Sequence, residues 1–293
     1  MRIAELFKEK KTVLSFEIFP PKRNDPVDTV YQTIDALKDL APDFISVTYG
    51  AGGSTKGHTV EIASHIQKNC GINALPHLTC ATSTRREVEE ALGKLEEAGV
   101  ENLLALRGDI PEGWEGLADG SHYTYAKELI EHVRARGGFS LGAACYPETH
   151  QEALTRNSDL KHLKAKVDAG AEFLISQLFF DNELFYDFME RLDLLDIHVP
   201  VTAGIMPMLN RNQIARTVEL SGCSLPKKFL RILDRYEHDP VAFREAGMAY
   251  AIEQIIDLMS WGISGIHLYT MNKPETARII VDSISAVRGS LNR

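Results

Sequence analysis

A carboxyl group stands alone in the first apolar run of the sequence, where Glu17 lies between Phe16 and Ile18. An unpaired carboxylate is costly in apolar surroundings, and ionisable groups in such places gather at functional sites. A desolvated carboxyl also suits general-acid catalysis, because it can hold a proton and donate it to a departing group. Glu17 is therefore the first candidate catalytic residue; the alternative is a strand residue that faces solvent or a helix.

Other polar residues follow short apolar runs in the same way, and each has a plain structural alternative. Asp109, which follows Arg107 and Gly108, is either a functional carboxylate or a turn residue or helix N-cap. His77 is either a site residue or a buried core histidine. Gln177 is either a buried amide bonded to the backbone or a reader of a heterocycle edge through two hydrogen bonds.

Three charged or polar residues share one helical face further along the chain. Asp159, His162 and Lys166 are spaced by three and four residues, which places them side by side on a helix. An ion-paired surface helix is the ordinary interpretation, and a phosphate partner for Lys166 is the functional one.

Eight short apolar, mostly β-branched runs alternate with eight helical patterns, and these elements must position the polar residues. The predicted strands are 12–19, 44–49, 73–78, 102–106, 139–146, 173–178, 198–204 and 265–269. The predicted helices are 28–40, 59–68, 85–97, 125–136, 159–168, 183–195, 212–220 and 274–287. This alternation predicts parallel strands joined by right-handed crossovers.

Two closures fit such a pattern, a (β/α)8 TIM barrel and an open doubly wound sheet. Eight units in 293 residues favour the barrel. The open sheet usually carries Gly-x-Gly-x-x-Gly after its first strand, whereas residues 19–23 contain no glycine and residues 50–54 have the wrong spacing. Barrel active sites lie at the carboxyl ends of the strands, where the candidate residues fall.

Two segments depart from the regular pattern. Residues 111–120 form an acidic, glycine-rich loop, either a lid or a long connection, and residues 223–261 add a helical insertion before the last strand. Since no linker or repeat is evident, we expect one domain over residues 1–293.

Composition excludes several classes of protein. The net charge of −9 argues against nucleic-acid and anionic-membrane partners, and no apolar run reaches the roughly 18 residues of a membrane span. The charged start of the chain does not resemble a signal peptide. Four cysteines without a C-x-x-C pattern predict reduced thiols in a cytoplasmic protein. Glu148 and His150 resemble half a metal site, but no third ligand is suitably spaced, so no metal is expected.

Seven short runs, taken in order, resemble the bacterial type of the 5,10-methylenetetrahydrofolate reductase family. They are SFEIFPP (15–21), SVTYG (46–50), PHLTC (76–80), ALRGDIP (105–111), YPETH (146–150), KVDAGA (166–171) and QLFFD (177–181). The resemblance covers about residues 13–287. It implies a flavoprotein on a (β/α)8 barrel, in which NADH or NADPH reduces FAD and the reduced flavin then reduces methylenetetrahydrofolate by a ping-pong sequence. It also implies a homo-oligomer without the regulatory domain of the eukaryotic enzymes.

The resemblance also assigns roles to residues. Glu17 matches the general acid that protonates N10 of the folate, and Asp109 matches the carboxylate that stabilises the cationic intermediate beside the flavin. The matching FAD-binding positions are Thr48, Tyr49, Ala51, His77, Arg107, Gly108, Asp109, Tyr125, Ala126, Tyr146, His150, Asp159, His162 and Lys166. The matching substrate-binding positions are Glu17, Thr48, Asp109, Gln177 and Lys273, and no metal is implied.

Four positions depart from the family pattern. His162 replaces an asparagine and Ala165 an arginine, Arg211 replaces an aromatic residue, and Lys273 replaces an arginine. A lysine is a point charge and cannot grip a carboxylate with two parallel bonds as arginine does, so the glutamate tail of the folate is held differently here.

Three competing functions fit a barrel with a polar rim. A flavin-free pterin-binding methyltransferase would bind folate without FAD. An aldolase-type lyase would need a lysine near the end of a strand, and the predicted strands carry none there. A non-catalytic binding barrel would leave the polar rim unexplained.

Overall fold

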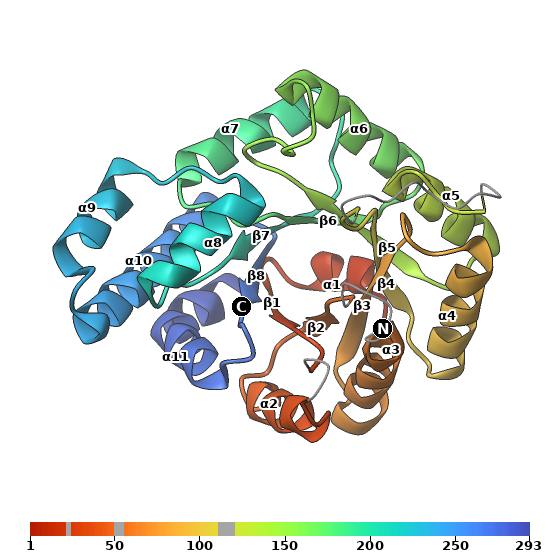
Figure 1. The fold of residues 1–293 in the computed structure, drawn as a ribbon, viewed down its shortest axis with the longest axis horizontal. Helices are drawn as coiled ribbons and strands as arrows, with labels where there is room; N and C mark the ends of the chain where they lie inside the picture. Colours follow the sequence, from red (N-terminus) through yellow and green to blue (C-terminus); the bar gives the residue numbers. More distant parts are fainter. Residues whose placement is uncertain (22–24, 50–55, 111–120) are drawn as a thin grey trace.

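Eight parallel strands close into a barrel in the order of the sequence, β1 to β8 (Figure 1). The computed structural model describes residues 1–21, 25–49, 56–110 and 121–293. The strands are β1 (Val13–Ile18), β2 (Phe44–Val47), β3 (Asn73–Thr79), β4 (Asn102–Leu106), β5 (Ser140–Cys145), β6 (Phe173–Ser176), β7 (Val201–Ile205) and β8 (Gly265–Tyr269). The predicted (β/α)8 TIM barrel is confirmed.

Helices surround the barrel and connect successive strands (Figure 1). They are α1 (Ile3–Glu9), α2 (Asp28–Lys38), α3 (Lys56–His65), α4 (Arg85–Glu97), α5 (Ala126–Arg136), α6 (Arg156–Asp168), α7 (Asn182–Asp193), α8 (Arg211–Ser221), α9 (Lys227–Tyr236), α10 (Pro240–Trp261) and α11 (Pro274–Leu291). A π-helical segment, η1 (Ile66–Cys70), directly continues α3. The sequence predicts one uninterrupted helix over residues 59–68, so the π winding is a finding of the structure.

The strands are buried on both faces, as parallel strands covered by helices must be. All six residues of β1 are buried, Glu17 among them. Four of the eight predicted strands, those at β1, β2, β5 and β6, extend one or two residues beyond the observed ends. The polar residues Thr48, Tyr49, Tyr146 and Gln177 follow strands β2, β5 and β6 rather than belonging to them.

Helix α1 covers one end of the barrel and was not predicted. Its buried residues Ile3 and Leu6 pack with Val13, Phe44 and Phe173 in one apolar cluster. The backbone N–H of Ile3 donates to Asn102 Oδ1 at 2.7 Å. A seven-residue helix with two buried positions gives too short a periodic pattern to recognise in a charged segment.

The predicted insertion before the last strand consists of α9 and α10, which lie beside α8 at the left of Figure 1. Phe229 of α9 and Phe243 of α10 are buried in a cluster with Phe180 and Tyr269. Asp239 caps the start of α10 by accepting hydrogen bonds from two backbone N–H groups. The insertion therefore adds a second layer of packing outside the rim near β6 and β8.

Among the described residues, none of the helices is long and apolar enough to cross a bilayer. The four cysteines are free thiols, and all are buried.

Candidate functional site

A cavity of about 590 Å³ opens at the carboxyl ends of β4 and β5, between α5 and α6. It is lined by residues from all of these elements and from the loop after β5. Eight of the predicted FAD-binding residues line it: Arg107, Tyr125, Ala126, Tyr146, His150, Asp159, His162 and Lys166. They come from four separate segments of the chain, at residues 107, 125–126, 146–150 and 159–166, and the fold gathers these segments into one place.

Helix α6 supplies three of these residues, as its predicted face requires. Thr155 caps the helix by accepting from the Ser158 N–H, which fixes where the face begins. Asp159 accepts a hydrogen bond from the backbone N–H of His150 at 3.0 Å. Lys166 donates to the carbonyl of Ala144 at 2.5 Å, and desolvation lowers its pKa. Lys166 therefore offers a partly desolvated ammonium group at the cavity wall.

Arg107 is held in a two-bond ion pair with Glu152, at 2.5 and 2.7 Å. The hydrogen bond from Arg107 lowers the pKa of Glu152, and the same bond raises the pKa of the Arg107 guanidinium. Glu152 is mostly exposed, so water and other anions can reach this pair. An anionic ligand at Arg107 would replace Glu152 rather than meet a free guanidinium.

Aromatic rings complete the cavity wall. The Tyr146 ring meets the edge of His150 at a centroid distance of 4.6 Å, and Tyr125 stacks on His162 at 6.2 Å. Burial raises the pKa of Tyr146 to about 12. Burial, with the charge of Arg107, lowers the pKa of His150. The cavity thus combines flat apolar faces with two cations.

Glu17 belongs to a second, buried cluster inside the barrel. Its Oε2 lies 3.5 Å from Nε2 of His77 on β3 and 3.5 Å from Nε2 of His267 on β8. Burial lowers the pKa of His77 to about 4, although the Glu17 charge opposes this change. His77 is therefore uncharged near neutral pH.

His267 joins the Glu17 cluster to the barrel interior, and sequence reasoning missed it. Its Nδ1 lies 2.8 Å from Oγ of Ser15, and its Nε2 lies 3.4 Å from Oγ of Ser46. Ser15 and His267 are paired residues of the β1–β8 register. The signal was available in the sequence, because a lone histidine in an apolar strand is as unusual there as the lone carboxylate in 12–19.

Tyr269 lies beside the Glu17 cluster, where its ring meets the His267 ring edge to face at a centroid distance of 5.4 Å. Burial raises its pKa far above the ordinary value, and the charges of Glu17 and Tyr146 add to this effect. The Tyr269 hydroxyl donates to the carbonyl of Ser176 at 2.9 Å. Thr270 Oγ1 donates to the Glu17 carbonyl at 2.7 Å, which fixes the backbone that carries the carboxyl. The sequence analysis did not single out Tyr269 or Thr270.

The loop after β4 carries Gly108 and Asp109. Gly108 has φ of +85°, and a Cβ there would lie 2.8 Å from Cβ of Thr79. Only glycine fits this turn without strain. Asp109 is exposed, and its charge contributes to the raised pKa values of Arg107 and Tyr146. Its carboxylate therefore acts on the cavity from the solvent side.

The remaining predicted residues lie around the same rim without lining the cavity. Thr48 and Tyr49 are half-buried after β2, and burial raises the pKa of Tyr49. The side-chain oxygen of Gln177 accepts from the Leu178 N–H at 2.9 Å. Lys273 is exposed and precedes α11. Ala51 lies outside the described residues.

Glu148 and His150, which resemble half a metal site in the sequence, contact other groups in the structure. Glu148 Oε2 accepts from the backbone N–H of Ser224 at 2.9 Å, and His150 lines the cavity.

Comparison with known proteins identifies the family. A sequence model described as methylenetetrahydrofolate reductase matches residues 2–285. The chain belongs to the methylenetetrahydrofolate reductase family of enzymes. It is 34% identical over 271 residues to 5,10-methylenetetrahydrofolate reductase of Pectobacterium carotovorum subsp. carotovorum, covering 92% of this chain and 89% of that protein. The resemblance seen in the seven runs is thereby confirmed.

Two further relatives are similar over most of this chain. The 5,10-methylenetetrahydrofolate reductase of Escherichia coli K12 is 33% identical over 276 residues, covering 94% of this chain and 92% of that protein. Methylenetetrahydrofolate reductase (NADH) 1 of Arabidopsis thaliana is 33% identical over 288 residues, covering 94% of this chain and 49% of the plant protein.

Among solved structures, an uncharacterised protein from Clostridium thermocellum matches with a TM-score of 0.68 at 13% identity, covering 98% of both chains. It is described as binding two copies of 5-methyl-5,6,7,8-tetrahydrofolic acid. At this identity the likeness shows the barrel fold alone.

Proposed function

We propose that this protein reduces 5,10-methylenetetrahydrofolate to 5-methyltetrahydrofolate with NADH or NADPH, through bound FAD and by ping-pong half-reactions. The observation that carries the proposal is a large cavity at the carboxyl ends of β4 and β5 in the same barrel as a buried carboxyl, Glu17 of β1. The family and the names of its bacterial members supply the substrate.

The cavity fits a flavin dinucleotide in size and in chemistry. Its volume of about 590 Å³ lies within the range of sites that bind cofactors. Lys166 and Arg107 would hold the pyrophosphate by charge-assisted hydrogen bonds, and the rings of Tyr125 and Tyr146 offer flat faces to the ring systems. When bound, FAD would accept hydride from the nicotinamide nucleotide and give it to the folate.

Glu17 would supply the proton that opens the methylene bridge. The bridge must open to an iminium cation before it accepts hydride, and the departing N10 needs a proton as it leaves. Glu17 is only 7% exposed, so water does not compete for its position. His77, uncharged near neutral pH, adds no positive charge that would repel the developing cation. His267 and Ser15 continue the polar chain behind the carboxyl.

The other rim residues would bind and orient the folate. Asp109 would stabilise the iminium cation by its negative charge. Gln177 can offer an amide donor and acceptor to the pterin once its oxygen leaves the Leu178 N–H. Thr48 and the ammonium of Lys273 would complete the site, Lys273 as a single charge near the glutamate tail.

The visible absorption spectrum of the purified protein tests this function. We expect a flavin band that bleaches with NADH or NADPH under anaerobic conditions and returns when methylenetetrahydrofolate is added. A protein that is colourless and takes up no added FAD would contradict the proposal and would instead favour a flavin-free pterin-binding barrel.

A further inference from the structure

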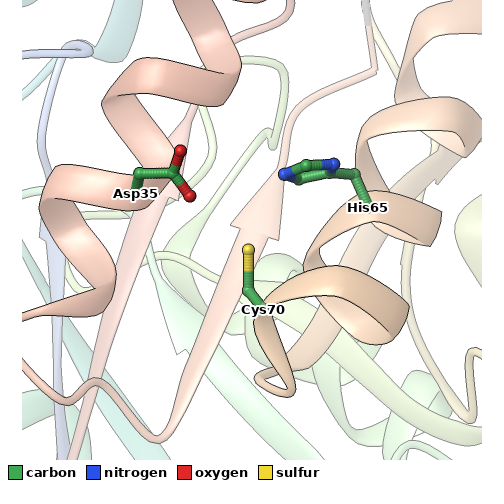
Figure 2. Close-up of side chains that lie close together, drawn as sticks. All are labelled: Asp35, His65 and Cys70. Carbon is green, nitrogen blue, oxygen red and sulfur yellow. The ribbon is translucent and has the colours of Figure 1, made fainter.

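Three potential metal ligands meet on the outside of the barrel, away from the cavity. Asp35 of α2, His65 of α3 and Cys70 of η1 place one ligand atom each within 4.8 Å of the others. Figure 2 shows the three side chains turned toward a common point between the two helices. A carboxylate, an imidazole and a thiolate are the three ligand types that zinc combines in proteins.

The π-helical winding of η1 creates this arrangement. His65 ends α3 and Cys70 ends η1, so the two residues are five apart. In an α-helix, residues five apart point about 140° away from each other around the axis. The i to i+5 bonding of a π turn brings them instead to one side. Gly71, with φ of +67°, then ends the segment. The local winding therefore aims His65 and Cys70 at the same place.

His65 presents a ring nitrogen that the rest of the protein leaves unused. Its Nε2 is buried and has no hydrogen-bond partner within the part of the chain that the structure describes. A buried polar atom without a partner is costly, and a metal bond would satisfy it. The ring is held in place by Tyr31, which stacks on it at 4.2 Å and donates its hydroxyl to Glu61 at 2.8 Å. The stacked Tyr31 ring restricts the orientation of the imidazole.

The two other ligands differ in exposure, which gives the site an inner and an outer side. Cys70 is 8% exposed, whereas Asp35 is exposed. Burial raises the pKa of the Cys70 thiol, the charge of Asp35 adds to the rise, and Lys38 opposes it. A divalent ion overcomes this because coordination displaces the thiol proton. The exposed Asp35 side leaves a path for the ion and a position for a water ligand.

We propose that Asp35, His65 and Cys70 form a zinc site that ties α2 to the end of α3. Zinc binds through the Cys70 thiolate, His65 Nε2 and one Asp35 oxygen, with water in the fourth position. On binding, the Cys70 thiol loses its proton to solvent while the sulfur–zinc bond forms, and no redox change is involved. The spacing of the cysteines gave no sign of this site, because its ligands come from two separate helices.

Cobalt titration of the purified, reduced and chelator-treated protein tests the proposal. We expect one Co²⁺ per chain, a thiolate-to-cobalt absorption band in the near ultraviolet, and loss of that band when equimolar Zn²⁺ is added. Zinc should also raise the unfolding temperature, because it binds the folded chain. A cobalt spectrum without the thiolate band, or an unfolding temperature that zinc leaves unchanged, would overturn the site.

Substitutions identify the ligands. Outer contacts of a metal site change affinity by about 10- to 100-fold, so we expect Cys70→Ser to weaken zinc binding by at least about 100-fold. Asp35→Asn, at an exposed position that folding tolerates, should weaken it by at least about 10-fold. His65→Phe keeps an aromatic ring against Tyr31 and removes both ring nitrogens.

Two substitutions serve as matched controls. Cys223→Ser changes another buried cysteine, and Asp39→Asn changes the neighbouring carboxylate that follows α2. Zinc affinity should stay at the wild-type value in both. If Asp35→Asn and Cys70→Ser bind zinc as tightly as these controls, the three residues do not form the site.

Discussion

The barrel has two polar regions that differ in construction, one at its rim and one in its interior. In the cavity at β4 and β5, Arg107 pairs with a largely exposed Glu152, and α6 presents Lys166 at the wall. In the barrel interior, Glu17, His77 and His267 are buried and fixed by neighbouring strands. Polar contacts that a ligand can displace, such as the Arg107–Glu152 pair, suit the binding and release of a large ligand. Partners that stay fixed suit the repeated handling of one proton.

The largest expected effect is on one of the two half-reactions, and it comes from a substitution of Glu17. Glu17→Gln should slow flavin reoxidation by methylenetetrahydrofolate by about 10²- to 10⁴-fold, the usual contribution of a general acid. Flavin reduction by the nicotinamide nucleotide should change little, because it needs no proton at N10. Stopped-flow absorption of each half-reaction measures this. Near-normal turnover of the folate in the variant would remove Glu17 from the mechanism.

The buried cluster of Glu17, His77 and His267 should also make the stability of the folded protein depend on pH. The pKa of His77 is about 4 in the folded protein against 6.5 for the free side chain, so the unfolded chain binds a proton that the folded chain refuses. This stability is present above about pH 6.5 and is lost as pH falls toward 4, by about 3 kcal/mol in all.

His77→Gln should flatten that part of the pH profile, measured by urea unfolding at several pH values. His198→Gln is the matched control, because His198 is mostly exposed, and it should leave the slope as in the wild type. If the slope is the same in His77→Gln and in the control, burial of a neutral His77 does not govern acid sensitivity.

In the cavity at β4 and β5, a substitution should instead change the affinity for the cofactor. Lys166→Met should weaken FAD binding by about 10- to 100-fold, since a hydrogen bond to a charged group contributes about 1.5–3 kcal/mol. Lys164→Met is the control on the same helix, because Lys164 pairs with Asp168 and does not line the cavity. Fluorescence of released flavin reports the affinity. Equal losses in both variants would mean a general effect of charge on α6.

The smallest effect should come from a substitution of Asp109. Asp109 is exposed, so solvent screens its charge, and Asp109→Asn should slow the folate half-reaction by only about 5- to 10-fold. Flavin affinity should hold within about 2-fold of the wild type. Loss of flavin with an unchanged folate rate would reverse the assignment and place Asp109 with the cofactor.

The sequence predicted most of the barrel, because each strand and each covering helix shows its own periodic pattern. Strands β4 and β8 and helix α4 have the predicted bounds. Features that depend on contacts far apart in the chain were beyond such reasoning. The Arg107–Glu152 pair, the position of His267 beside Glu17, and the meeting of Asp35 with Cys70 all require the closed fold.

For the candidate site, too, the sequence pattern predicted some features and not others. The face of Asp159, His162 and Lys166 follows from helical spacing alone, and the structure places all three at one cavity. Their roles, the FAD, the NADH or NADPH co-substrate and the homo-oligomer came from the family resemblance, and the cytoplasmic location came from the cysteines. All of these stay predictions.

Closure of the barrel has a consequence for synthesis of the chain. Strand β1 pairs with β8, and Ser15 meets His267 across 252 positions of sequence. While the chain leaves the ribosome, β1 keeps an unpaired edge until residues 265–269 emerge, and such edges invite wrong pairing. A chain cut short before β8 therefore lacks both the closing strand and half of the surroundings of Glu17. Nonsense mutations late in the gene should abolish the enzyme as completely as early ones.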